Sequence, residues 1–285
     1  MRRLPIVESR SAILESLPDT PSTFGEAGVL PLLTDAQGRA YDYLRLSVTD
    51  RCDLACLYCM PPSGEEDHAV RAELLSFEEA SRLVGVLAAM GIRRVRFTGG
   101  EPLVRKDVVR LVEKVRATTA VERLVMTTNA TRLADLAKPL RDAGLDGVNV
   151  SIDSLDEERF RRITRGGELS RVLAGIHAAV DAGLALKINV VALGGENDDE
   201  VARLVDFAWS LGATPRFIEL MPLGEGAKLP TTMRMSAADV ISLLGSRIGD
   251  EEGVRSEGEG PARYRMAKDG SGRRVGFITP LSDEF

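Results

Sequence analysis

The chain has 285 residues, 44% of them hydrophobic and 28% charged, which is typical of a globular protein with one large core. Its formal net charge of −6 argues against a basic face for nucleic acid. No apolar run is long enough for a membrane span, and the first residues lack the apolar segment of a signal peptide. We therefore expect a cytoplasmic protein that binds neither nucleic acid nor a membrane.

Residues 1–30 contain three prolines among Ser, Thr and Gly residues and show no sustained periodicity, so we expect them to form a flexible extension. The pattern changes after this segment. Leu44, Leu46 and Val48 alternate with polar residues, which predicts a strand. The three cysteines of the chain follow this strand directly and fall within eight positions.

These three residues, Cys52, Cys56 and Cys59, cannot all pair in internal disulfides, and in a reducing compartment they indicate a metal site. Thiolates at this spacing can converge on zinc or on an iron–sulfur cluster. A structural zinc site needs a fourth ligand, and neither His68 nor His177 has a usual spacing for it. A four-iron cluster held by three cysteines leaves one iron free to bind a substrate or cofactor. A zinc-stabilised binding module without enzymatic activity remains an alternative.

The next element is a helix that begins at the capping box Ser76-Phe77-Glu78-Glu79 and ends at Gly91. A strand over residues 92–97 follows and ends at Thr98-Gly99-Gly100-Glu101-Pro102. Strands and helices then continue to alternate. Further helices are predicted at 107–117, 133–143, 169–182 and 198–211, and further strands at 123–127, 147–151, 184–192 and 215–220.

Six strand-then-helix units predict parallel strands with right-handed crossovers. A doubly wound sheet fits this count too, but the unusual residues lie at successive strand ends, where barrel enzymes keep their sites. We therefore expect an α/β fold with a partial (β/α)6 barrel, similar to a TIM barrel, over residues 31–222. Residues 223–285 should form a small, incomplete C-terminal region that closes one side of the barrel. This region should contain a helix at 237–244, a charged loop, and strands at 262–267 and 274–279.

The Gly-Gly-Glu-Pro turn is a second candidate for ligand binding. Its glycines allow the backbone to approach a ligand closely, and Glu101 can accept hydrogen bonds from an ammonium group. Such a turn alone is usually just a turn. The turn directly follows the second strand, and the cysteines directly follow the first. This combination indicates ligand binding far more specifically than the turn alone.

Charged residues in buried strands are the third candidate feature. Strands of a parallel barrel are usually apolar throughout, yet Arg45, Arg96 and Lys187 each interrupt one. A buried cation is costly unless it is paired. A carboxylate such as Glu219 could pair with one of them, but three cations on separate strands favour a phosphorylated ligand.

The spacing C-x3-C-x2-C, with Tyr58 before the last cysteine, and the Gly-Gly-Glu-Pro turn resemble the signature of the radical S-adenosylmethionine (SAM) superfamily. Five blocks resemble one family in particular, GTP 3′,8-cyclase, in that family's order. The resemblance extends from about Pro31 to Phe285. The blocks are residues 43–52, 95–103, 127–129, 148–155 and 216–222.

The resemblance implies one 4Fe-4S cluster and SAM as cofactors. An electron from the cluster would split SAM into a 5′-deoxyadenosyl radical that takes the C3′ hydrogen of GTP, and C3′ would then attack C8 of the guanine. The implied enzyme is a lyase that forms (8S)-3′,8-cyclo-7,8-dihydroguanosine 5′-triphosphate, the first step of molybdenum cofactor biosynthesis.

The resemblance also assigns residues and partners. Cys52, Cys56 and Cys59 would bind the cluster, Tyr58, Gly100, Glu101, Ser151 and Met221 would contact SAM, and Arg45, Arg96, Thr127 and Lys187 would contact GTP. The implied partners are GTP, a reductant such as flavodoxin or ferredoxin, and the downstream cyclic pyranopterin monophosphate synthase. A homodimer is compatible with the resemblance.

The chain departs from the family's pattern in two places. Ala130 stands where the family usually has glycine after Asn129, which predicts a local backbone adjustment. A second cysteine triad, which binds a cluster that holds the guanine, should follow Phe285, and the family's glycine-ended tail should follow it. We therefore expect this chain to bind one cluster and SAM but to cyclise GTP weakly or not at all. A radical SAM enzyme for another small molecule or a peptide is the second alternative.

Overall fold

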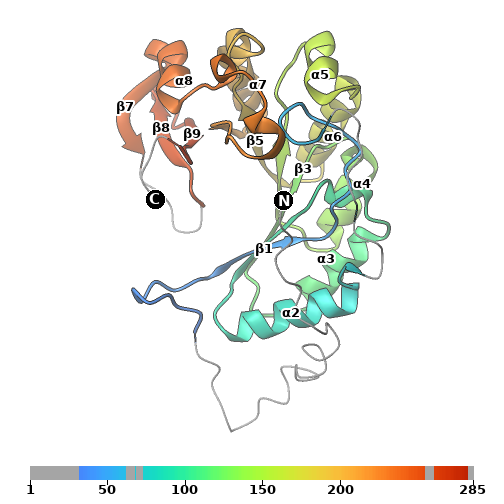
Figure 1. The fold of residues 1–285 in the computed structure, drawn as a ribbon. Helices are drawn as coiled ribbons and strands as arrows, with labels where there is room; N and C mark the ends of the chain where they lie inside the picture. Colours follow the sequence, from blue (N-terminus) through green and yellow to red (C-terminus); the bar gives the residue numbers. More distant parts are fainter. Residues whose placement is uncertain (1–31, 62–67, 69–72, 254–259, 282–285) are drawn as a thin grey trace.

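The computed structural model describes residues 32–61, 68, 73–253 and 260–281 (Figure 1). The expected extension over residues 1–30 lies outside the described residues. No helix in the described ranges is long and apolar enough to cross a membrane.

One curved sheet organises the described part of the chain, with nine strands in the order β1-β2-β3-β4-β5-β6-β9-β8-β7. Strands β1 to β6 are parallel and follow the order of the sequence, and β9 continues the sheet parallel to β6. Strands β8 and β7 add an antiparallel extension. The strands are β1 (Tyr43–Ser47), β2 (Arg94–Thr98), β3 (Arg123–Thr128), β4 (Gly147–Ser151), β5 (Ala185–Val191), β6 (Thr214–Ile218), β7 (Ile248–Gly253), β8 (Arg263–Ala267) and β9 (Arg274–Ile278).

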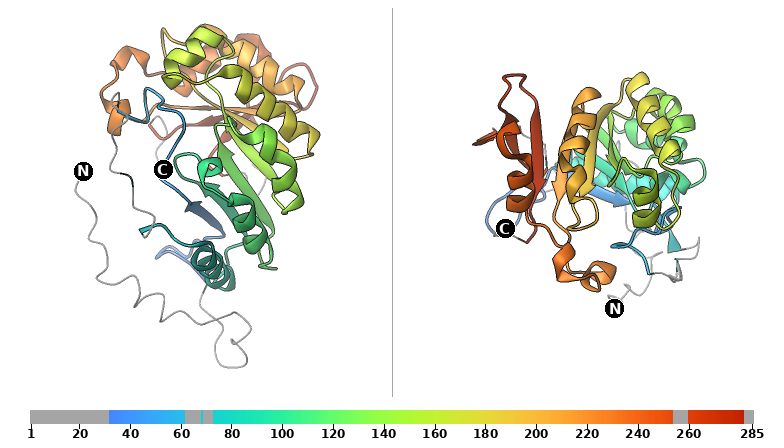
Figure 2. Two further views of the ribbon diagram at one scale, coloured as in Figure 1. Left: turned by 90° about the vertical axis from the view of Figure 1, so that its right-hand side faces the viewer. Right: turned by 90° about the horizontal axis from the view of Figure 1, so that it is seen from above.

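The helices follow the strands and cover one side of the sheet, as the views of Figures 1 and 2 show for α2 to α6. Apolar strand residues such as Phe97, Met126 and Val150 are fully buried in the core on that side. The helices are α2 (Phe77–Ala89), α3 (Val108–Arg116), α4 (Leu133–Asp142), α5 (Glu157–Thr164), α6 (Leu169–Asp181), α7 (Val201–Ser210) and α8 (Ala237–Leu244), and the 3₁₀ turns are η3 (Pro102–Val104), η4 (Asp198–Glu200), η5 (Gly224–Ala227), η6 (Thr231–Met233) and η7 (Gly245–Arg247).

The expected fold class is confirmed. Sequential order of six parallel strands is what an open partial barrel requires, whereas a doubly wound sheet reverses its order at a switch point. The capping box at α2 is also present, because the Ser76 hydroxyl accepts from the Glu79 N–H at 3.1 Å and the Glu79 carboxylate accepts from the Ser76 N–H at 2.7 Å. The C-terminal strands extend the same sheet through β9, and the domain boundary at residue 222 stays a prediction.

Two elements differ from the expectations. Helix α5 was not predicted, because only Phe160, Ile163 and Thr164 of its eight residues are buried and five are charged. Strand β7 lies in the segment expected to be a charged loop, and its pairing with β8 is what makes it a strand. Both elements are too short and too polar to show a clear periodicity.

Candidate active site

The inner face of the sheet, opposite the helices, is polar. Residues paired across parallel strands point to the same face, and neighbours along a strand point to opposite faces. Leu46 and Phe97 are buried on the helix side, so Arg45 and Arg96, which are register partners, face inward. The register places further residues on this inner face, namely Tyr43, Arg94, Thr127, Asn149, Ser151, Lys187, Asn189 and Arg216.

The three cations expected from the sequence therefore share the inner face with Arg94 and with a fifth cation, Arg216. Its side chain is 1% exposed, and its Nε and Nη2 atoms donate to Oδ1 of Asn189 at 3.0 and 2.7 Å. Arg45 is exposed, while Arg96 and Lys187 are half-buried. Arg216 was not predicted from the sequence, although it interrupts an apolar strand in the same way as Arg96 does.

Several donors on the inner face are buried without a partner. The hydroxyl of Tyr43, Nε of Arg96 and Nδ2 of Asn149 have no hydrogen-bond partner among the described residues. Buried polar groups in proteins are nearly always bonded. The pKa of Arg96 is lowered to about 10, mainly because burial disfavours its charge and because Arg216 and Arg45 lie nearby. An anionic ligand with several oxygens would satisfy these donors and stabilise these charges.

The cysteine loop, residues 52–60, crosses the end of helix α5. The N–H groups of Ala55 and Leu57 donate to the carbonyl oxygens of Thr164 and Ile163 at 3.2 and 2.9 Å. Carbonyls in the last turn of a helix have no partner inside the helix. The loop thus caps α5, and α5 in turn fixes the loop.

Arg165 completes this attachment. It has a left-handed backbone conformation with φ of 53° at the end of α5. Its Nη1 atom donates to the carbonyl oxygen of Ala55 at 3.3 Å and to that of Met60. One side chain therefore joins two turns of the cysteine loop, a role that the sequence analysis did not predict because α5 itself was not predicted.

The loop after β3 holds the beginning of the cysteine loop. Asn129 Nδ2 donates to Oδ1 of Asp53 at 2.8 Å, and the Thr131 hydroxyl donates to Oδ2 at 2.7 Å. The same Asn129 amide lies 3.7 Å from Sγ of Cys52, which also accepts from the N–H of Leu54 at 3.4 Å. Donors directed at a sulfur suit a thiolate that binds a metal cluster. Ala130 has a φ of 64°, a left-handed conformation that favours glycine, and the expected backbone adjustment at this position stays a prediction.

The three cysteines are free thiols, with Cys59 exposed and the other two half-buried. Burial raises the pKa of Cys52 and of Cys56, and the nearby thiols Cys59 and Cys52 raise that of Cys56 further. Within the described ranges, no three Cys, His, Asp or Glu side chains form a group that could hold a single metal ion. A four-iron cluster binds each cysteine to a different iron, so its ligands spread more widely. Three thiols in one loop, with two donors directed at Sγ of Cys52, fit such a cluster.

The Gly-Gly turn packs against the backbone that leads into the cysteine loop. A Cβ atom on Gly99 would lie 2.1 Å from the carbonyl oxygen of Thr49, and one on Gly100 would lie 2.4 Å from that of Arg51. The N–H groups of Gly100 and Glu101 donate to these two oxygens, each at 2.8 Å. The glycines therefore allow two loops of the chain to pack closely. From the sequence, a close approach of these glycines to a ligand was expected.

Glu101 is directed into the protein. Its side chain is 1% exposed, and its carboxylate accepts from the Leu103 N–H at 2.9 Å, the Thr128 hydroxyl at 2.7 Å and the Asn129 N–H at 2.6 Å. Burial raises its pKa to about 7. These bonds join the ends of β2 and β3, and a contact of Glu101 with SAM stays a prediction.

The remaining candidate residues lie around the same strand ends. Ser151 ends β4 and is half-buried beside Asn189. Met221 follows β6 and is 46% exposed. Thr127 lies on the inner face of β3 as the register partner of Asn149. Tyr58 reaches across to Asp153, just beyond β4.

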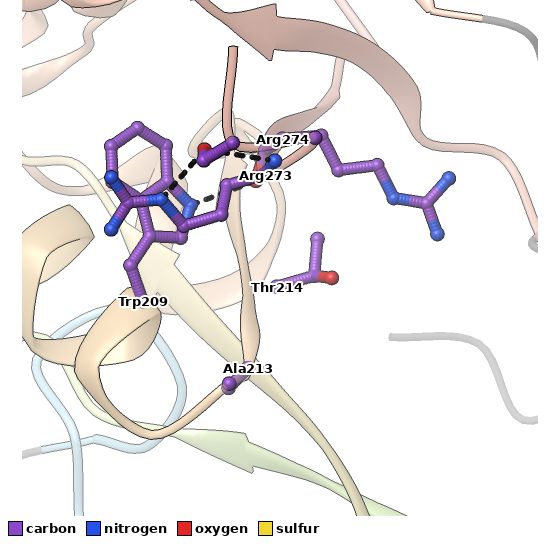
Figure 3. A pocket seen from close by; sticks show the side chains of 8 residues that line it. Trp209, Ala213, Thr214, Arg273 and Arg274 are labelled. Carbon is purple, nitrogen blue, oxygen red and sulfur yellow. Dashed lines mark hydrogen bonds between the residues drawn. The ribbon is translucent and has the colours of Figure 1, made fainter. Parts of the chain in front are cut away.

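A separate pocket lies at the opposite, amino ends of β6 and β9 (Figure 3). It encloses about 220 Å³ between Trp209, Thr214 and the β8–β9 turn. Arg273 stacks over the Trp209 ring at 4.5 Å and bonds to Ser271 and Asp269. The cysteine loop follows the carboxyl end of β1, so this pocket lies at the edge of the sheet opposite to the one at which parallel-barrel enzymes react.

Comparisons with known proteins agree with this geometry. The family model of the radical SAM superfamily matches residues 46–208. GTP 3′,8-cyclase of Heliobacterium modesticaldum is 47% identical over 261 residues, which cover 89% of this chain and 77% of that protein. GTP 3′,8-cyclase 1 of Pseudomonas aeruginosa is 45% identical over 252 residues, which cover 88% of this chain and 76% of that protein.

Solved structures show a similar fold at low sequence identity. Streptococcus suis SuiB bound to S-adenosylmethionine has a TM-score of 0.60 and 18% identity, over 71% of this chain and 45% of SuiB. Methylornithine synthase has a TM-score of 0.58 and 16% identity, over 71% of this chain and 60% of that enzyme. At this identity the two structures support the shared barrel and not a shared substrate.

Proposed function

The chain belongs to the radical SAM superfamily and, within it, to the GTP 3′,8-cyclase family, and we propose that it binds GTP along the inner face of its barrel and SAM at the cysteine loop. The observation that carries this proposal is the inner face itself. Five cations from four strands lie there, together with buried donors that lack a partner within the described structure. A triphosphate supplies the negative charge and the acceptor oxygens that this face needs.

We assign the cluster to the three cysteines of the loop and the SAM site to Tyr58, Gly100, Glu101, Ser151 and Met221. When bound, the cluster and SAM supply a carbon radical that can abstract hydrogen. The protein fixes the position of the cysteine loop through contacts with α5, Asp53 and Asp153. It also orients the nucleotide next to this loop. For the nucleotide we assign Arg45, Arg96, Thr127 and Lys187, and we add Arg216.

The proposed reaction joins C3′ and C8 of GTP, which makes the enzyme a lyase. We propose that the three cysteines, all of which lie in the cysteine loop, bind a single cluster there. The further proposals rest on the resemblance to the family and on the composition of the chain. A one-electron donor such as flavodoxin or ferredoxin would reduce the cluster in the cytoplasm, a synthase would consume the product, and two copies would form a homodimer.

Anaerobic reconstitution with iron and sulfide tests the function. The chain should bind about four irons, turn brown, and form 5′-deoxyadenosine from SAM when a reductant is added. GTP should bind to the same preparation. An iron-free protein that forms no 5′-deoxyadenosine would refute the function itself.

Substitutions of the inner-face cations test whether the substrate is GTP or another molecule. Charge-removing changes at Arg45, Arg96 and Lys187 should each weaken GTP binding. Unchanged affinity would instead favour a radical SAM enzyme that acts on a peptide or another small molecule.

A further inference from the structure

We propose that Tyr43 is a specificity-determining residue, whose hydroxyl donates a hydrogen bond to the terminal phosphate of the bound nucleotide and thereby selects a triphosphate over shorter phosphate chains. This inference rests on the proposed function and adds a residue that neither the sequence motifs nor the comparisons single out.

The hydroxyl of Tyr43 needs an acceptor. It is buried and has no hydrogen-bond partner in the described part of the chain. Its surroundings are cationic, because the guanidinium carbons of Arg96 and Arg94 lie 5.3 and 5.6 Å from the ring centroid and Arg45 and Arg216 are close enough to act on it electrostatically. Guanidinium groups donate hydrogen bonds and cannot accept them. None of these neighbours can accept a hydrogen bond from the phenol.

The proton stays on this hydroxyl. Burial raises the pKa of Tyr43, although the four arginines act in the opposite direction. The phenol is therefore a neutral donor at physiological pH, as a phosphate oxygen requires. Two other unpartnered donors, Arg96 Nε and Asn149 Nδ2, lie on the same inner face, from β2 and β4. Three strands thus direct donors toward a polyanion.

The position of Tyr43 along β1 indicates which phosphate it meets. It is the first residue of β1, and the cysteine loop follows the other end of that strand. A strand rises about 3.3 Å per residue, so Tyr43 lies about 13 Å below Ser47, at the carboxyl end. The proposed reaction occurs at the ribose beside the cysteine loop, so the phosphate chain extends away from it along the cations. The terminal phosphate then lies deepest, near Tyr43.

The substitution Tyr43→Phe isolates this contact, since the ring and its stacking on the arginines remain. Equilibrium binding to the full chain would be measured for GTP, GDP and GMP, and inorganic tripolyphosphate and pyrophosphate would be used as competitors. We expect Y43F to lose about tenfold in affinity for GTP and tripolyphosphate, the usual effect of one hydrogen bond to a charged group. Affinity for GMP should change less than about twofold.

Tyr41→Phe is the matched control, because Tyr41 is 53% exposed and only two residues away. It should bind all three nucleotides like the wild type. Thermal unfolding of the ligand-free proteins provides a second test. Y43F should be as stable as the wild type or more stable, because the removed hydroxyl has no partner within the described structure.

The outcomes separate the two proposals. Wild-type protein that binds no guanine nucleotide and no tripolyphosphate would overturn both. Wild-type protein that prefers GTP, with Y43F unchanged or weakened equally for GTP and GMP, would overturn only the role of Tyr43. A marked loss of stability in ligand-free Y43F would also overturn it, because the hydroxyl would then serve the fold.

Discussion

The hydroxyl of Tyr58, the residue before the last cysteine, donates a 2.5 Å hydrogen bond to Oδ2 of Asp153, although the two residues lie 95 positions apart. Asp153 is 4% exposed, and its Oδ1 accepts from the N–H of Val191 at 2.8 Å. Its pKa is raised to about 6 by burial. The pair therefore connects the cysteine loop to the ends of β4 and β5, where the proposed SAM site lies.

Tyr58→Phe should loosen the cysteine loop, because it removes this bond and leaves one oxygen of a buried carboxylate without its donor. We expect the variant to fold, to be less stable by about 1–3 kcal/mol, and to lose its cluster faster when exposed to a chelator. Asp153→Asn is the matched variant. Tyr58 is still present in it, and the amide of the new side chain can donate to the Tyr58 hydroxyl, so the contact is kept. Equal rates of iron loss in Y58F and wild type would show that the bond does not hold the loop.

Glu101→Gln should change how stability depends on pH. The pKa of Glu101 is raised from an ordinary value of 4.5 to about 7, so the folded protein keeps a proton that the unfolded chain releases at lower pH. Its contribution to stability is therefore lost as pH rises from about 4.5 to 7, by roughly 3 kcal/mol at most. Denaturant unfolding of the ligand-free wild type across this range should show that decline, and E101Q should lack it.

The same substitution should also cost stability at every pH. Gln can keep an acceptor for the Leu103 N–H and the Thr128 hydroxyl, but its amide group would face the Asn129 N–H, donor against donor. A loss of about 1–3 kcal/mol at pH 8 is expected. An identical pH dependence in both proteins would mean that Glu101 titrates normally.

Arg165→Ala should free the cysteine loop from α5. The guanidinium bonds to Ala55 and Met60 are lost, and alanine is strained by the φ of 53°. Arg165→Gly is the matched variant, because it loses the same bonds but tolerates this backbone conformation. Hydrogen exchange of residues 55–60 should become faster in both variants, whereas only R165A should show the additional loss of global stability. Unchanged hydrogen exchange of residues 55–60 in both variants would show that Arg165 does not hold the cysteine loop.

Arg216→Met should weaken nucleotide binding more than it weakens the fold. A buried cation is costly to the folded protein, so its removal offsets part of the loss of its bonds to Asn189. We expect GTP affinity to fall about tenfold or more and the salt dependence of binding to decrease. Arg171→Met, on the exposed surface of α6, is the control and should bind GTP normally. Equal binding by R216M and wild type would remove Arg216 from the site.

The periodicity of the sequence was sufficient to predict most elements of the fold. Apolar residues that alternate along β2 and recur along α4 have to be buried, and local capping residues such as Ser76 mark where helices begin. The same local information located the cysteine loop and the Gly-Gly turn. It failed for α5, whose apolar residues are too few to show a period, and for β7, which depends on its neighbour.

The candidate site could be predicted only in part. Arg45, Arg96 and Lys187 stood out because charge is rare in parallel strands, and the register then placed them on one face with Arg216. The structure adds contacts that the sequence did not predict: Glu101 bonds to the Thr128 hydroxyl, and the two glycines pack against the backbone that leads into the cysteine loop, while their contacts with a ligand stay predictions. Residue type tells what a side chain can bind but not which donors surround it.

The amino-acid sequence by itself determined the order of strands and helices, the cysteine spacing and the family, because these depend on residues that are neighbours along the chain. Only the tertiary structure decided that α5 and Arg165 hold the cysteine loop, that Tyr58 meets Asp153, and that Tyr43 lies among arginines with its hydroxyl buried. The physical reason is that burial and hydrogen bonding are set by groups brought together from distant positions, and no local pattern records them.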